Sequence, residues 1–163
     1  MTVGKGKLEI VDSRLTRSLV LRRSVGSLRR SLPSQVKTTY AKSGFSYGIA
    51  KVKGDWLYRG TSAAAQLTNR PTFVLVSQID VSTQAIALVR FDVKKDHRET
   101  QYCEAGAWSG VKEENKDTIP LTVTRQPNTN TLTITPASDL PAGEYLLIAD
   151  QGKGYDGYNF SVK

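Results

Sequence analysis

Cysteine and histidine are almost absent from this sequence, each occurring once in 163 residues, as Cys103 and His97. A lone cysteine excludes an intramolecular disulfide, and the two side chains together supply too few ligands for a typical zinc site. Apolar runs are also short: none reaches 18 residues, and the N-terminus lacks the apolar core of a secretory signal. We therefore expect a soluble protein that binds no metal. The cytoplasm is the favoured location, although a secreted chain that had lost its signal would look the same.

Signs of catalysis are equally scarce. His97 lies in the charged stretch Lys-Asp-His-Arg-Glu, and no Gly-x-Ser-x-Gly elbow accompanies it, so a Ser/His/Asp mechanism is not indicated and His97 is predicted to be a solvated surface residue. Residues 152–154, Gly-Lys-Gly, lack the spacing and the following Ser or Thr of a phosphate loop. We predict no catalytic residue and no cofactor, and hence a protein that is not an enzyme.

Acidic residues are missing from one segment. Residues 13–42 contain eight basic side chains, six serines and no carboxylate. Residues 1–59 carry thirteen basic against three acidic residues, a net charge of +10, whereas residues 60–163 carry ten against twelve, a net −2. The basicity of the chain therefore belongs to its N-terminal third, and residues 1–42 are interpreted as a basic N-terminal arm.

The arm repeats the tetrapeptide Leu-Arg-Arg-Ser with a spacing of seven residues. On a helix the repeat would form an apolar stripe with a basic flank. Gly26 and the serines weaken that helix, so an extended arm or a strand is the competing interpretation. The candidate assembly or phosphate-contacting residues are Leu21, Val25, Leu28 and Leu32 on the stripe, and Arg22, Arg23, Arg29 and Arg30 on the flank.

The remainder, residues 43–163, has the period-2 alternation of β-strands. Residues 8–11 also read as a short strand. Residues 45–50 and 56–58 are predicted to form a hairpin that turns at Gly54 and Asp55. Residues 73–79 and 85–91 are the strongest predicted core strands, and a charged turn follows at residues 94–99. We expect an all-β fold, an antiparallel β-sandwich of about nine to eleven strands, with Leu75, Leu88, Leu147 and Phe160 nearly buried.

The last third carries the clearest pattern. Residues 119–123 and 132–134 alternate as two arms of a hairpin that ends at Pro136, residues 145–149 read as a strand buried on both faces, and residues 158–162 as a closing strand. The runs Leu-Pro-Ala-Gly-Glu-Tyr at residues 140–145 and Tyr-Asn-Phe-Ser-Val at residues 158–162 resemble the ending of uncharacterised bacterial β-sandwich domains. Asn69 to Phe73, Leu88 to Arg90, and Arg98 with Glu99 are similar to the middle of such domains. The resemblance covers roughly residues 60–163 and implies a fold but no activity.

Function follows by elimination. The leading expectation is a non-enzymatic structural or binding β-sandwich that assembles with itself or with a protein partner through the N-terminal arm. The alternative is a nucleic-acid-associated, coat-like protein whose arginines contact phosphates. Anionic lipid is a less favoured partner, so association with a membrane is not expected.

Overall fold

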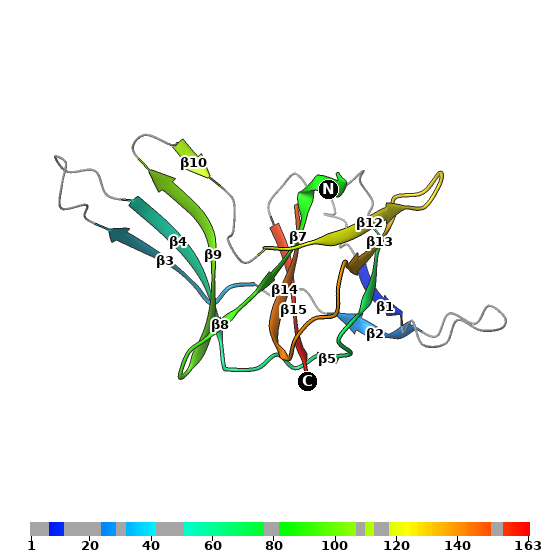
Figure 1. Ribbon diagram of the computed structural model, residues 1–163, viewed down its shortest axis with the longest axis horizontal. Coiled ribbons are helices and arrows are strands. Elements are labelled where there is room, and N and C mark those ends of the chain that lie inside the picture. Colours follow the sequence, from blue (N-terminus) through cyan, green and yellow to red (C-terminus); the bar gives the residue numbers. More distant parts are fainter. Residues whose placement is uncertain are drawn as a thin grey trace, which may run out of the picture.

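The computed structural model describes residues 7–11, 24–28, 32–41, 51–76, 82–106, 110–112, 118–150 and 155–163. These residues form fifteen strands in three sheets and one 3-10 turn, η2 (Thr83–Ala85) (Figure 1). The fold is all-β, as predicted, with more strands than the nine to eleven expected, because several have only two or three residues. No helix in the described part is long and apolar enough to cross a bilayer.

The three sheets are named A, B and C. In spatial order, sheet A contains β12 (Leu121–Arg125), β13 (Thr131–Pro136), β6 (Thr72–Val76), β1 (Lys7–Val11) and β2 (Ser24–Leu28). Sheet B contains β11 (Thr118–Ile119), β7 (Ile86–Arg90), β14 (Gly143–Asp150), β15 (Tyr155–Val162) and β5 (Gln66–Leu67). Sheet C contains β10 (Gly110–Lys112), β9 (His97–Gly106), β4 (Lys51–Arg59) and β3 (Gln35–Ala41), with β8 (Asp92–Val93) beside β9. All pairs are antiparallel except β15 with β5.

The main core lies between sheets A and B, because alternate residues of their facing strands are apolar. Phe73 of β6 meets Phe160 of β15 with ring centroids 5.3 Å apart, and Tyr145 of β14 stacks on Phe160 at 5.4 Å. The prediction for the core is confirmed: the four residues named from the sequence, Leu75, Leu88, Leu147 and Phe160, are at most 1% exposed.

Sheet B is buried on both faces along β14. Leu147 belongs to the core against sheet A, whereas its neighbour Leu146 packs with Tyr58, Val89 and Phe91 in a second cluster that includes β4 of sheet C. Successive side chains of a strand point to opposite faces, so this continuous apolar run serves two cores. The predicted burial of residues 145–149 is confirmed, with Ile148 partly exposed.

The β12–β13 hairpin is confirmed as well, with one correction at its start. Gln126 N–H donates to Thr131 O at 2.9 Å to close the turn, and Asn128 adopts φ 56°, a left-handed conformation that asparagine tolerates. Residues 118–119, however, do not extend the hairpin: they form β11 and pair with β7 in sheet B. Pro120 separates the two strands, and because it has no N–H it is suited to the point where the chain changes sheet.

The predicted turn at Gly54 and Asp55 is wrong. Both residues lie inside β4, which runs without interruption from Lys51 to Arg59. Gly54 pairs with Cys103 and Asp55 with Gln101, so the register shifts by one residue on β9 at this point. A glycine inside a strand often marks such a bulge rather than a turn. The predicted partner strand, residues 45–50, lies outside the described residues, and the charged turn ends at His97, where β9 begins.

The N-terminal segment contributes strands to the sheets. The predicted strand at residues 8–11 is confirmed as β1, which pairs with β6 over five residues and with β2 on its other side. The helical interpretation is wrong for residues 24–28, because Ser24–Leu28 is strand β2. Gly26 and two serines give this stretch little helix propensity, and β1 offers it backbone hydrogen bonds instead.

Candidate functional site

The predicted arm residues are only partly placed. Leu21, Arg22, Arg23, Arg29 and Arg30 lie outside the described residues. Val25 and Leu28 lie in β2, with Leu28 opposite Leu8 of β1, so the stripe that they would share on a helix does not form there. Leu32, just before β3, is 64% exposed. The structure therefore does not bring the eight predicted residues together into one described site.

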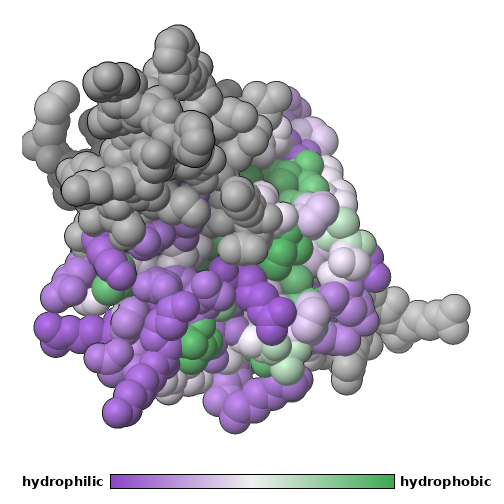
Figure 2. All heavy atoms as spheres, turned by 60° about the vertical axis from the view of Figure 1, so that its left-hand side comes forward, coloured by the Kyte–Doolittle hydropathy of each residue, from purple (hydrophilic) through white to green (hydrophobic). Residues whose placement is uncertain are grey.

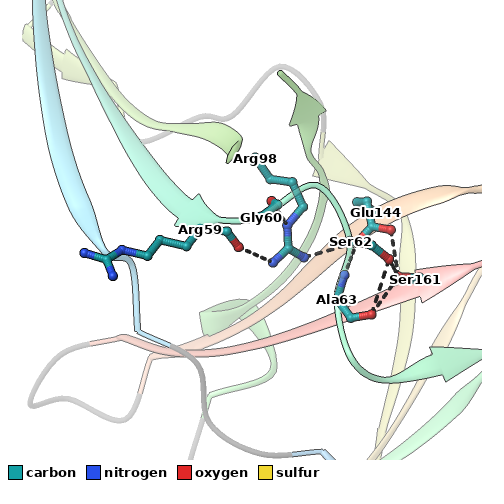
Figure 3. Close-up of polar contacts among 7 residues, drawn as sticks. All are labelled: Arg59, Gly60, Ser62, Ala63, Arg98, Glu144 and Ser161. Carbon is teal, nitrogen blue, oxygen red and sulfur yellow. Dashed lines mark hydrogen bonds and ion pairs between the residues drawn. The ribbon is translucent and has the colours of Figure 1, made fainter. Parts of the chain in front are cut away.

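The most conspicuous group of chemically active side chains is a buried polar cluster, formed by Arg98, Glu144 and Ser161 (Figure 3). Arg98 comes from β9, Glu144 from β14 and Ser161 from β15, and all three are less than 9% exposed. Arg98 Nη1 donates to Glu144 Oε2 at 3.1 Å, and Ser161 Oγ donates to Glu144 Oε1 at 2.7 Å. Both oxygens of the carboxylate are thus engaged.

The same cluster fixes the connection from β4 to β5. Ala63 N–H donates to Glu144 Oε2 at 2.7 Å, and Arg98 Nε donates to the carbonyl oxygen of Gly60 at 3.1 Å (Figure 3). Gly60 adopts φ 76°, a conformation that glycine enters without the steric cost of a Cβ. The Arg98 guanidinium also lies 5.2 Å from the ring centroid of Phe91, within range of a cation–π interaction.

These contacts favour a structural role for the polar cluster. A serine nucleophile requires a base that takes its proton and an approach for the substrate. Ser161 is 2% exposed and already contacts Glu144, the carbonyl of Ala63 at 3.3 Å and Ser62 Oγ at 3.1 Å. Glu144 is in turn paired with the buried guanidinium of Arg98, so it is not free to act as that base. Within the cluster the charges of Arg98 and Glu144 compensate each other, and their contact joins sheet C to sheet B.

A second, exposed group of charges lies at the turn between β8 and β9. His97 Nδ1 lies 2.7 Å from Asp96 Oδ1 and its Nε2 lies 3.4 Å from Glu99 Oε2, while Lys94 Nζ lies 3.1 Å from Glu99 Oε1. The hydrogen bond with Asp96 raises the pKa of His97 above its usual value. Burial would raise the pKa of Glu99, but the hydrogen bonds from Lys94 and His97 outweigh it and lower that pKa. The His97 side chain is 28% exposed, so it is partly covered rather than fully solvated, and both of its ring nitrogens contact carboxylates of the turn.

Other features in the described part are local. A shallow, open surface hollow is lined by Arg125, Asn128, Thr129 and Asn130, which belong to the β12–β13 turn or its edge. No group of three metal-ligating side chains occurs among the described residues. Polar side chains cover most of the described surface on the side of sheet C, with smaller hydrophobic areas between them (Figure 2).

No family model matches the chain, and no curated protein matches it either. The polar cluster was not predicted from the sequence, although two of its members, Glu144 and Ser161, stand inside the two terminal runs that carry the resemblance. Glu144 interrupts the apolar strand of residues 143–149, and Ser161 stands between Phe160 and Val162. A carboxylate at such a position signals a buried partner, because an unpaired buried charge is costly.

Proposed function

We propose that this chain is a non-enzymatic β-sandwich module that assembles with copies of itself or with a protein partner through its N-terminal segment, residues 1–42. The observation that carries the proposal is the position of β2. This strand comes from the basic segment and is the last strand of sheet A in the described part of the chain. The outer edge of a terminal strand presents backbone groups to which another chain can add a strand.

The packing of sheets A and B supports the sandwich. Facing apolar residues of two sheets, such as Phe73 and Phe160, interdigitate in the main core, which is how the two sheets of a sandwich are held together. The polar cluster supports the non-enzymatic role, because its carboxylate, hydroxyl and guanidinium are committed to one another and to backbone groups.

Light scattering during size-exclusion chromatography tests the assembly. We expect the purified protein to be larger than a monomer, and Leu21→Asp with Leu28→Asp to reduce its mass, because burial of apolar surface supplies most of the energy of association. Replacing Arg22, Arg23, Arg29 and Arg30 with glutamine is the matched control and should have a smaller effect on mass. A wild-type protein that stays monomeric at high concentration would refute self-assembly and leave only assembly with a different protein partner.

A second candidate function is supported by the charge of residues 13–42, which carry eight basic side chains and no carboxylate. Such a segment can neutralise the phosphates of nucleic acid in a coat-like assembly. In that case the arginine substitutions should have the larger effect. They should abolish binding to nucleic acid and flatten its salt dependence, while the two leucine substitutions should leave the binding unchanged. The ratio of absorbance at 260 and 280 nm reveals copurified nucleic acid before any titration.

A further inference from the structure

The outer edge of β12 has a regular pattern of backbone groups. Gln126 N–H bonds to Thr131 O and Ala137 N–H bonds to Pro120 O, both at 2.9 Å, so the even-numbered residues from 120 to 126 face β13. Antiparallel pairing alternates bonded and non-bonded residues. Leu121 and Val123 therefore direct their N–H and C=O groups away from β13, toward an edge where no described strand pairs.

The side chains of the same two residues are also incompletely covered. Leu121 and Val123 are partly exposed and pack against the margin of the main core, whereas Thr122 and Thr124 are exposed on the other face of the strand. A strand added beside β12 would thus satisfy the backbone groups of Leu121 and Val123 and extend the cover of the core at the same time.

Apart from β2, the other edges among the described strands are short or charged. The strands β5 and β11 at the edges of sheet B have two residues each, and β3 carries the exposed Lys37. Short strands and lysines are features that protect an edge against pairing. β12 has five residues in regular register with β13, and its proline precedes it rather than interrupting it.

We infer that β12 pairs antiparallel with β12 of a second copy of this chain, about a twofold axis at Val123. Because Leu121 and Val123 face outward, this register places Val123 opposite Val123 as a bonded pair and Thr122 opposite Thr124, a pairing that threonines favour. Charges do not oppose it: Arg125 is the single charged residue of β12 and lies opposite Leu121 of the other copy, so the two guanidinium groups are at opposite ends. The inference rests on the proposed role in assembly but uses a different strand.

The self-paired register makes a charge-swap experiment possible. Val123→Lys and Val123→Glu each place like charges opposite one another, which should weaken dimerisation by about tenfold or more. An equimolar mixture of the two variants should restore the dimer, because the introduced lysine then faces the introduced glutamate. Val76→Lys and Val76→Glu are the matched controls, since Val76 is 43% exposed but lies in β6, which pairs on both sides. Sedimentation equilibrium gives the masses, and denaturant unfolding verifies that each variant is folded.

The experiment is carried out with the natural N-terminal segment and again with Leu21→Asp and Leu28→Asp. Loss of mass in both Val123 variants with rescue in their mixture, and no change in the Val76 variants, is the expected result in both backgrounds. If the leucine variants alone remove all assembly and the Val123 variants change nothing, the β12 pairing is wrong while the proposed function stands. Loss without rescue in folded variants also overturns the self-paired register. A wild type that is always monomeric overturns both the β12 pairing and self-assembly through the N-terminal segment.

Discussion

Arg98 and Glu144 form a buried ion pair between sheets C and B, with Nη1 of the arginine 3.1 Å from Oε2 of the glutamate. Their side chains are 4% and 10% exposed. Burying two charges is costly, and good geometry and further hydrogen bonds are needed to offset the loss of hydration. Ala63, Ser161 and the carbonyl of Gly60 supply those bonds. The pair therefore fixes the contact among β9, β14 and the connection from β4 to β5.

Removing one partner of this pair should be strongly destabilising. We expect Glu144→Ala to lower the free energy of unfolding by about 3–5 kcal/mol, because the buried guanidinium loses its counter-charge. The double variant Arg98→Met with Glu144→Met should recover part of that loss. Asp139→Asn is the control: it breaks the exposed pair with Arg70, whose N–O distance is 4.0 Å, and should cost less than about 1 kcal/mol. Denaturant unfolding measures all three, and equal effects at both pairs would contradict the structural role of the cluster.

The centre of the main core gives a second prediction. Phe160 is fully buried and contacts Phe73 and Tyr145 with its ring. Phe160→Ala should lower the free energy of unfolding by about 3–5 kcal/mol, because it removes apolar contacts and leaves a cavity. Val93→Ala is the control, since Val93 is 50% exposed, and it should change stability by less than about 0.5 kcal/mol. Similar midpoints for the two variants would argue against the packing of β15 at the core.

Much of this fold could be predicted because strands are indicated by the local sequence, either by alternation or by a short apolar run. Short runs of this kind include Val74 to Val76 and Tyr145 with Leu146. The polar cluster was harder to predict from the sequence. Arg98, Glu144 and Ser161 are separated by 46 and 17 residues and meet only through the arrangement of strands in sheets B and C. The turn predicted at Gly54 was wrong because a glycine is compatible with either a turn or a bulge. Pairing with the neighbouring strand β9 decides between the two.

Gly143 and Arg90 provide a test that is specific to one close approach. A Cβ at Gly143 would lie 3.0 Å from Nε and Nη2 of Arg90, whose Nη2 donates to Ala142 O at 2.9 Å. Gly143→Ala should therefore destabilise the protein by about 1 kcal/mol, through loss of that hydrogen bond. In an Arg90→Ala background the same substitution should be neutral or stabilising, because alanine restricts the unfolded chain more than glycine does. An identical cost in both backgrounds would exclude the proposed clash.

The turn between β8 and β9 predicts a pH dependence. The pKa of His97 is raised, first by its hydrogen bond with Asp96, so its contribution to stability is present below its unfolded pKa of about 6.5 and is lost as the pH rises through the folded value. The pKa values of Asp96 and Glu99 are lowered, so their contributions are lost as the pH falls below about 4. Wild type should be more stable relative to His97→Gln at about pH 5.5 than at about pH 8. Parallel denaturation midpoints across that range would refute the coupling.

The N-terminal segment allows a test of the predicted division between an arm, residues 1–42, and a β-sandwich, residues 43–163. β1 pairs with β6 over five residues and stands between β6 and β2. Deleting residues 1–31 should therefore lower the free energy of unfolding by at least about 2 kcal/mol, because each backbone hydrogen bond lost contributes about 1 kcal/mol and the edge of β6 becomes open. Deleting residues 1–6, which precede β1, is the control and should leave the denaturation midpoint nearly unchanged. A longer deletion as stable as the full chain would support a separable arm instead, and light scattering on the same samples would show whether the opened edge of β6 leads to aggregation.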